Sequence, residues 1–169
     1  MTSPALIGAG AGVGLILASV VPDGQPMLVW NASPSQPIGL YRRLPGAAHV
    51  SDRVLVRLPP HLADLAARRG YLAPSAYLLK PVAAVSGDRV CRLGTRIFLR
   101  GRIAARAAVR DGLRRALPTW QGCRRLEMGD LFLLAADPDS FDSRYFGVVS
   151  GQAVTGRAAL VWSLGRGNL

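Results

Sequence analysis

The hydrophobic residues of this chain form one long uncharged run at the start and a series of shorter segments after it. The run, residues 5–21, has seventeen residues without a charge and is bounded by Pro4 and Pro22. As an α-helix it would be about 26 Å long, at ~1.5 Å per residue, which is the short end of what crosses a bilayer. We expect residues 1–22 to be a transmembrane anchor or signal segment, and residues 23–169 to form one domain.

The first part of the body carries one strand pattern and one helix pattern. Residues 50–58 alternate apolar and polar side chains, which predicts a half-exposed strand that ends at Pro59 and Pro60. Residues 61–69 have apolar side chains at helical spacing, so a short surface helix is expected before Gly70.

Strand patterns continue to the C-terminus. Further strands are expected at residues 76–85, 89–93, 96–100, 131–134 and 159–164. The second and third of these are spaced as a hairpin, and the last is expected to close the sheet. Residues 103–117 contain helix formers and arginines, and their state stays open. With 19 glycines and 12 prolines, the chain is expected to be mainly β, with short helices.

The charge balance points to an anionic partner. The formal net charge is +11 and the pI is near 11.3, which would suit nucleic acid or an anionic membrane. We favour the membrane, because the arginines are scattered along the sequence without interleaved aromatic residues for base stacking. No Lys or Arg precedes the apolar run and Arg42 and Arg43 follow it, so charge alone would keep the body cytoplasmic.

The two cysteines leave two possibilities open. Cys91 and Cys123 cannot build a metal site alone, and no histidine stands near either at ligand spacing. They would pair as a disulfide if the domain lies outside the cytosol, and would be two small buried hydrophobes if it lies inside. No metal, nucleotide or flavin cofactor is expected.

Two prolines stiffen the segment that follows the apolar start. Residues 31–41 read Asn-Ala-Ser-Pro-Ser-Gln-Pro-Ile-Gly-Leu-Tyr. Pro34 and Pro37 fix their own φ angles and remove two N–H donors, so the segment must be an irregular loop or a strand end. It fits a proline-rich linker, or a loop that holds Ser33 or Ser35 still as a nucleophile.

Lys80 is the one lysine in a chain with twenty arginines. Arginine does not lose its proton near neutral pH, so Lys80 alone could supply a basic amine. It lies in the apolar strand pattern at residues 76–85, where Leu78 and Val82 share its face and burial would lower its pKa. The alternative is a lysine at a strand edge with its amine in water.

Four segments resemble segments of a known family and follow one another in the same order. The first is residues 31–41, and the others are residues 79–91, 117–123 and 139–147. The first resembles the signature Asn-x-Ser/Thr-x-Ser-x-Pro-x-Gly-x-Tyr of TraF-type conjugative transfer peptidases, which are relatives of type I signal peptidases. The resemblance, over about residues 29–149, implies a signal-peptidase-like β fold preceded by one N-terminal transmembrane helix.

By this resemblance the chain is a serine endopeptidase with a Ser-Lys dyad. Ser35 would attack a peptide carbonyl and neutral Lys80 would take its proton. Ser33 matches the place of a hydroxyl that helps bind the oxyanion. Some members of the family circularise pilin subunits, and nothing in the sequence decides between hydrolysis and ring closure.

The last segment implies the supporting residues. Its Asp-Ser-Phe-Asp-Ser-Arg run is similar to the family's Ser-x-Asp-Ser-Arg box. Ser140 would then orient the Lys80 amine, and Asp142 would pair with Arg144 to brace the site. The resemblance also implies a disulfide between the two cysteines.

The resemblance further implies a location, a substrate and a binding mode. The protein would lie in the inner membrane with its catalytic domain on the periplasmic side. It would act on a pilin precursor or another preprotein, alongside other proteins of the conjugation apparatus. The substrate would add as a strand to the β edge near Val82 to Val85, with small side chains in shallow pockets.

Other functions remain open on the sequence. A general type I signal peptidase would use the same residues, although Ser35-Gln36-Pro37 departs from its Ser-Met-x-Pro pattern. A non-catalytic assembly protein would need neither Ser35 nor Lys80. A self-cleaving repressor is disfavoured by the apolar start and by the lack of a helix-turn-helix segment. A Ser-His-Asp site is also disfavoured, because His49 and His61 form no Asp-His pair near Ser35.

Overall fold

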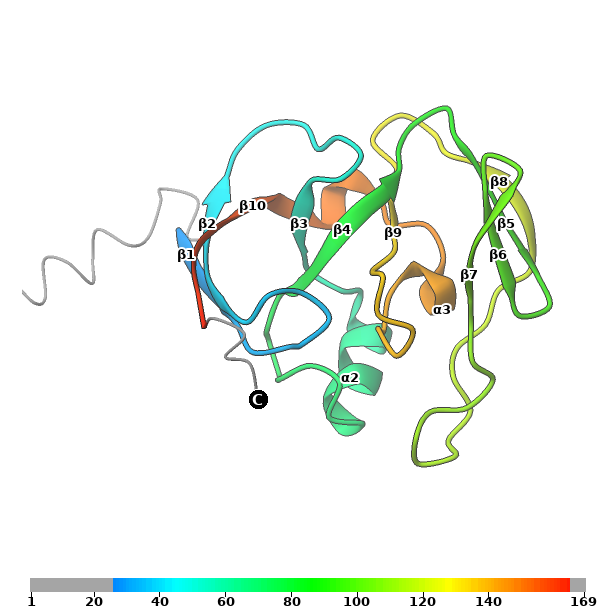
Figure 1. Ribbon diagram of the computed structural model, residues 1–169, viewed down its shortest axis with the longest axis horizontal. Coiled ribbons are helices and arrows are strands. Elements are labelled where there is room, and N and C mark those ends of the chain that lie inside the picture. The colour runs from blue at the N-terminus through cyan, green and yellow to red at the C-terminus, as the bar shows by residue number, and fades with distance from the viewer. Residues whose placement is uncertain (1–25, 165–169) are drawn as a thin grey trace, which may run out of the picture.

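Two antiparallel sheets form the framework of the domain. The computed structural model describes residues 26–164 (Figure 1). Its strands are β1 (Leu28–Asn31), β2 (Gly39–Leu44), β3 (Arg53–Val56), β4 (Leu78–Ala84), β5 (Arg89–Leu93), β6 (Arg96–Leu99), β7 (Arg102–Arg106), β8 (Gly122–Arg125), β9 (Phe132–Leu133) and β10 (Val154–Ser163). The order is β1-β2-β10-β3-β4-β9 in the larger sheet and β7-β6-β5-β8 in the smaller one. The expectation of a mainly β domain is confirmed.

The helical segments are short. They are α2 (Pro60–Arg68), α3 (Ser143–Phe146) and the 3₁₀ helix η1 (Gly151–Ala153). Helix α2 matches the surface helix predicted at residues 61–69, and Pro60 suits its first turn, where a backbone N–H has no helical partner. The expected anchor, residues 1–22, lies outside the described residues. Among residues 26–164, no helix has both the length and the apolar character needed to span a membrane.

The strand predicted at residues 50–58 is more deeply buried than its pattern indicated. Val54, Leu55 and Val56 in β3 are all fully buried. The expectation of a half-exposed strand is therefore wrong. Strand β3 is interior, between β10 and β4, and its two faces pack into two different hydrophobic clusters.

The last strand completes the larger sheet from its interior. The sequence predicted that residues 159–164 close the sheet without saying where. Strand β10 lies inside it, hydrogen-bonded to β2 on one side and to β3 on the other. The C-terminal strand thus joins β2, which follows the serine loop, to β3, the neighbour of the strand that carries Lys80.

The smaller sheet contains the predicted hairpin. Strands β5 and β6 pair in register from Val90↔Leu99 to Leu93↔Arg96. Residues 103–117, whose state the sequence left open, form most of β7 and then an irregular loop closed by a bridge between Arg110 and Ala116. This loop borders the cleft described below.

Hydrophobic clusters join the two sheets and the helices. The largest packs α2 and α3 against β3, β4 and β9, with Val56, Leu78 and Tyr145 among its members. A second cluster, which includes Val90 and Phe132, fills the space between the two sheets. Strand β4 contributes to both, and Figure 1 shows it running from the larger sheet toward the smaller one.

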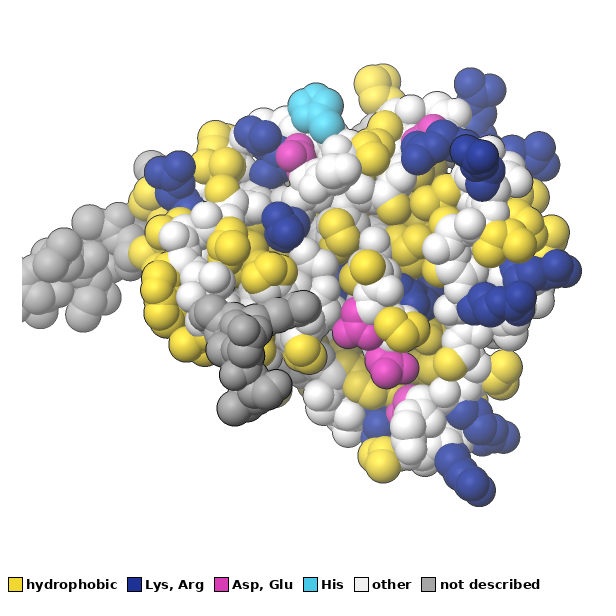
Figure 2. All heavy atoms as spheres, viewed as in Figure 1, with side chains coloured by type: hydrophobic (Ala, Val, Ile, Leu, Met, Phe, Trp, Pro, Cys, Tyr) yellow, Lys and Arg dark blue, Asp and Glu magenta, His cyan; other side chains and the backbone are white. Residues whose placement is uncertain are grey.

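The positive charge is concentrated on the smaller sheet. Residues 89–125 hold eleven of the twenty arginines and one of the ten acidic residues, Asp111. Figure 2 shows these basic side chains gathered on the side of the molecule that carries β5 to β8. Part of the arginines that look scattered along the sequence, those on β5 to β8 and their turns, therefore lie together, because consecutive short strands return them to the same sheet.

Candidate active site

Asn31 holds the serine loop in shape. Its side-chain amide donates to the carbonyl oxygens of Ser33 (2.9 Å), Gln36 (3.2 Å) and Pro37 (3.0 Å), and its Oδ1 accepts from the backbone N–H of Ser33 (3.1 Å). One side chain thus satisfies backbone groups that have no strand partner. Sequence reasoning assigned Asn31 no role, although it is the first residue of the family signature.

The end of the loop is anchored to the sheet at two points. The Tyr41 hydroxyl donates to the carbonyl of Pro37 over 2.9 Å. At Gly39, the backbone of β10 approaches so closely that an added Cβ would lie 2.1 Å from the carbonyl oxygen of Trp162. A side chain at residue 39 would push β10 away, so glycine is required there.

Lys80 reaches two serine hydroxyls from the interior of β4. Its Nζ lies 2.6 Å from Ser35 Oγ and 2.8 Å from Ser140 Oγ. The Lys80 side chain is only 4% exposed, and Leu78 and Val82, which share its face, are buried as well. The alternative of a lysine with its amine in water is therefore wrong.

Burial lowers the pKa of Lys80 from 10.5 to about 8. The loss of solvation is the main cause, because a buried ammonium has little water to stabilise it. The carboxylates of Asp142 and Asp137 oppose this effect and raise the pKa, whereas the Arg144 guanidinium lowers it. The amine is thus neutral in a substantial fraction of molecules near neutral pH.

Ser140 is placed by a buried ion pair. Asp142 and Arg144 are 0% and 2% exposed, and they make two parallel hydrogen bonds of 2.8 and 3.0 Å. Asp142 also accepts from the backbone N–H of Ala135, and Arg144 donates to the carbonyls of Ala135 and Pro138. The pair therefore fixes the loop between β9 and α3, which carries Ser140.

Three neighbours that sequence reasoning did not assign hold α3 in position. Ser143 Oγ accepts from the backbone N–H of Leu133 in β9, and the Trp120 indole donates to the Ser143 carbonyl. The buried Arg92 of β5 donates to the Arg144 carbonyl over 2.6 Å. A buried arginine whose partner is a backbone carbonyl leaves no pattern in the sequence.

Ser33 lies beside Ser35. Its hydroxyl is 3.0 Å from Ser35 Oγ, and Ser33 is the more exposed of the two residues. The contact joins Ser33, Ser35, Lys80 and Ser140 into one chain of polar groups. Such a chain can pass a proton from a serine hydroxyl to the amine.

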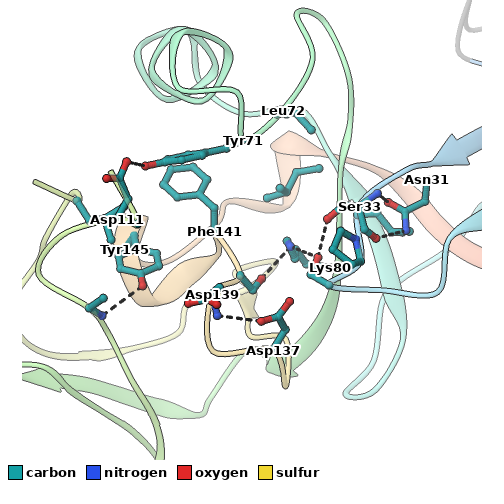
Figure 3. A pocket seen from close by; sticks show the side chains of 18 of the residues that line it. Asn31, Ser33, Tyr71, Leu72, Lys80, Asp111, Asp137, Asp139, Phe141 and Tyr145 are labelled. Atoms are coloured by element: carbon teal, nitrogen blue, oxygen red, sulfur yellow. Dashed lines mark hydrogen bonds between the residues drawn. The ribbon is translucent and has the colours of Figure 1, made fainter. Parts of the chain in front are cut away.

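A cavity of about 460 Å³ opens beside these groups. Ser33, Ser35, Lys80 and Ser140 line one part of it, and aromatic residues line another. Figure 3 shows Lys80 directed toward the serine loop, with the rings of Tyr71 and Phe141 at the other side of the cavity. In residues 26–164, no three His, Cys, Asp or Glu side chains are grouped as metal ligands would be.

The predicted binding edge at Val82 to Val85 is occupied. Strand β9 pairs with β4 at Val82 and Ala84, and Ala84 is fully buried. The expectation of an open edge there is wrong, because β9 covers it. The segment of β4 from Leu78 to Lys80 precedes this pairing and lines the cavity instead.

The cysteines pair as the family resemblance implied. Cys91 and Cys123 form a disulfide between β5 and β8, where they stand directly opposite each other. The bond closes a segment that contains β6, β7 and the loop beside the cavity. It lies in the smaller sheet, which packs against β4 and β9 through the second hydrophobic cluster.

Comparisons with known proteins identify the family. The model of the family "Signal peptidase, peptidase S26" matches residues 4–163. The chain is 34% identical to a conjugal transfer protein TraF of Agrobacterium fabrum over 145 residues, covering 79% of this chain and 81% of the relative. It is 32% identical to a conjugal transfer protein TraF of Agrobacterium tumefaciens, covering 94% of this chain and 93% of the relative.

A signal peptidase I from Enterococcus faecalis is a structural match with a TM-score of 0.37 and 17% identity, covering 66% of this chain and 97% of that chain. The family model spans nearly the whole sequence, and the TraF relatives exceed 30% identity over most of their length. The resemblance found in the four sequence segments is thereby confirmed, and the chain belongs to the signal peptidase family, peptidase S26.

Proposed function

We propose that this chain is a membrane-anchored serine endopeptidase that processes a pilin precursor in conjugative transfer, with Ser35 as nucleophile and Lys80 as base. The observation that carries the proposal is the 2.6 Å contact between Lys80 Nζ and Ser35 Oγ at a buried amine whose pKa is about 8. A neutral amine in hydrogen-bond contact with a hydroxyl is the arrangement that activates a serine without histidine.

The first half of the reaction forms an ester. Neutral Lys80 accepts the Ser35 Oγ proton while Oγ bonds to the substrate carbonyl carbon. The Ser33 hydroxyl and the Ser35 backbone N–H would stabilise the oxyanion that develops. The C–N bond then breaks, the Lys80 ammonium returns a proton to the leaving amine, and the acyl group remains on Ser35.

The supporting residues control the protonation of Lys80. Ser140 can accept a hydrogen bond from the amine in either protonation state, so it orients Nζ without adding a negative charge. Asp142 would favour the ammonium, but its carboxylate is engaged by Arg144. The amine therefore keeps a pKa at which it can act as a base.

The substrate would bind as an extended strand along β4. The Val82 N–H donates to Asp52 on the β3 side. Because successive residues of a strand direct their backbone groups to opposite sides, those of Leu79 point toward the cavity. A peptide paired there would pass beside Lys80 and bring its carbonyl to Ser35.

Release of the acyl group determines the product. Attack by water yields a trimmed linear chain. Attack by an amine of the substrate yields a ring, whose mass is one water less than that of the trimmed chain. In either case Lys80 takes a proton from the attacking group.

Mass spectrometry of a co-expressed pilin precursor tests the proposal. We expect trimming or ring closure with the wild-type chain, and neither with Ser35→Ala or Lys80→Met. An acid-quenched reaction should also show an acyl adduct on Ser35. Unchanged processing by both variants would instead support a non-catalytic assembly protein. Efficient cleavage of unrelated secretory preproteins, with no action on pilin, would support a general signal peptidase.

The paired cysteines support a periplasmic location for the catalytic domain. Disulfides persist in oxidising compartments and are rare in the cytosol, and Cys91 and Cys123 are bonded. Acid-quenched cells treated with a maleimide should show both cysteines protected from alkylation until a reductant is added. Alkylation before reduction would contradict this location.

An exposed aromatic stripe supports contact with a membrane. Trp30 and Trp162 are 50% and 53% exposed, and their ring centroids are 6.0 Å apart. Trp30 on β1 and Trp162 on β10 both pair with Leu40 on β2, which lies between these two strands. Paired tryptophans of this kind suit the interface between lipid headgroups and acyl chains.

Tryptophan fluorescence tests this contact in the full-length protein. In vesicles with brominated lipids, Trp30 and Trp162 should be quenched in single-tryptophan variants. Trp120 is the matched control, since it is only half-buried, packs against Phe132 and Gly147, and belongs to neither β1 nor β10. Equal quenching of all three would contradict membrane contact through this stripe.

A further inference from the structure

The cavity beside Ser35 has an aromatic wall that the proposed chemistry does not use. Tyr71, Phe141 and Tyr145 line it together with Leu72 and Leu117. Phe141 stacks on Tyr145 with ring centroids 6.0 Å apart and meets Tyr71 at 5.1 Å. Phe141 also follows Ser140 directly in the sequence, so the wall begins one residue from the hydroxyl that contacts Lys80.

The wall is held in place from behind. The Tyr71 hydroxyl donates to Asp111, and Asp111 also accepts from the Arg115 side chain over 2.7 Å. The Arg115 guanidinium lies over the Tyr71 ring, 5.7 Å from its centroid. The Tyr145 hydroxyl accepts from the backbone N–H of Ala108. These contacts keep the rings from closing the cavity, which is therefore preformed.

The size of the cavity argues against a site for small side chains alone. Its volume of about 460 Å³ lies within the range of sites that enclose a small organic ligand. Phe141 and Tyr145 are largely buried, so a methyl group would leave mainly the half-exposed Tyr71, Leu72 and Leu117 in contact with water. A large apolar side chain would remove that surface from water and gain contact with the rings.

We propose that this wall, made by Tyr71, Phe141 and Tyr145, is a specificity pocket that binds one bulky apolar side chain, aromatic or long aliphatic, of the peptide substrate. The inference rests on the proposed function, because it assumes that the peptide lies along the cavity. It differs from the expectation of shallow pockets alone, and it adds a second determinant to any small residue required at the scissile bond.

A phenylalanine scan of a model peptide tests the inference. The probes are copies of one alanine-rich peptide that is based on a cleaved precursor site, each with Phe at a different position. Rates of cleavage are measured with the full-length protein, and binding is measured by calorimetry with the Ser35→Ala variant. We expect Phe at one position to raise kcat/KM and the association constant roughly ten- to a hundredfold over Ala.

Two variants and a control assign the effect to the wall. Ala108→Trp should fill the cavity, since Ala108 is exposed and lines it. It should abolish the Phe preference, measured as the ratio of kcat/KM for the Phe peptide to that for the all-alanine peptide with the same variant. Tyr71→Ala should reduce the preference by removing one ring. Ala104→Trp is the matched control, on an exposed residue of β7 outside the cavity lining, and should keep the preference.

The outcomes separate this inference from the proposed function. Cleavage without a Phe preference at any position overturns the pocket and leaves the peptidase in place. A Phe preference in binding, lost in Ala108→Trp, supports the pocket even if no peptide is cleaved, and in that case the proposed function fails. A preference that survives both Ala108→Trp and Tyr71→Ala overturns the pocket, because another surface must then hold the side chain.

Discussion

Raising the pH should convert the Lys80 ammonium into a free amine and increase the rate of acylation. With a pKa of about 8, roughly one molecule in ten has a neutral Lys80 at pH 7. At the ordinary pKa of 10.5 the fraction would be roughly one in three thousand. Burial in β4 therefore increases the competent population about 300-fold, a gain that would be absent if the amine reached water.

The assay is kcat/KM for a cleaved peptide across pH values from about 6 to about 10. We expect the rate to rise about tenfold per pH unit on the acid side and to level off above an apparent pKa near 8. The Asp137→Asn variant should shift this curve to lower pH, because the Asp137 carboxylate raises the pKa of Lys80. A flat profile, or an apparent pKa near 10.5, would refute the assignment of Lys80 as the base.

The burial of Lys80 should also make the free energy of unfolding depend on pH. Below pH 8, Lys80 is protonated in both the folded and the unfolded chain, and its burial costs about 3 kcal/mol, at ~1.36 kcal/mol per pKa unit. Between about 8 and 10.5 the unfolded chain binds more protons than the folded one, so stability rises with pH. Above about 10.5 the cost is gone.

Chemical denaturation at several pH values measures this effect. The free energy of unfolding of the wild type should gain about 3 kcal/mol relative to Lys80→Met as the pH rises through this window. The Met variant removes the titrating group, so contributions from all other residues cancel in the difference. A difference that does not change with pH would show that the amine is not buried as described.

Three further substitutions test the support of the site. Asp142→Asn should lower the free energy of unfolding by about 3–5 kcal/mol, because it leaves the buried Arg144 guanidinium without its carboxylate. The control Asp88→Asn breaks a pair with a partly exposed arginine and should cost less than about 1 kcal/mol, so equal losses would contradict this reasoning. Asn31→Ala removes three hydrogen bonds to loop carbonyls and should reduce kcat/KM by roughly a hundredfold with little change in the pKa of the rate profile. Ser33→Ala should lower kcat about 10²- to 10³-fold if its hydroxyl binds the oxyanion, and a change in KM alone would assign it to substrate binding.

Several features of the molecule could be read from the sequence because they depend on local patterns. Turn residues separated the strands of the β5-β6 hairpin, and helical spacing marked α2. The family signature located the serine loop, and the single lysine among twenty arginines singled out Lys80. The resemblance implied a disulfide between Cys91 and Cys123, and the structure contains this bond.

Other features depend on which segments become neighbours, and local patterns do not record this. Alternation in residues 50–58 resembled a half-exposed strand, but β3 lies between β10 and β4, and two hydrophobic clusters bury its two faces. The edge at Val82 to Val85 looked open until β9 was placed beside it. The aromatic wall unites Tyr71, from the loop after α2, with Phe141 and Tyr145, just before and within α3, and this contact is decided only by packing.

The sequence by itself determined the residue types that a Ser-Lys site needs, the stiffness of the loop that carries Ser35, and the mainly β character of the domain. Only the tertiary structure decided that Lys80 Nζ lies 2.6 Å from Ser35 Oγ, and that burial lowers the pKa of this amine to about 8. The physical reason is that a pKa depends on the water and charge around a group. Those surroundings come from β3, β9 and the loop that carries Ser140, which are distant in sequence and adjacent only after folding.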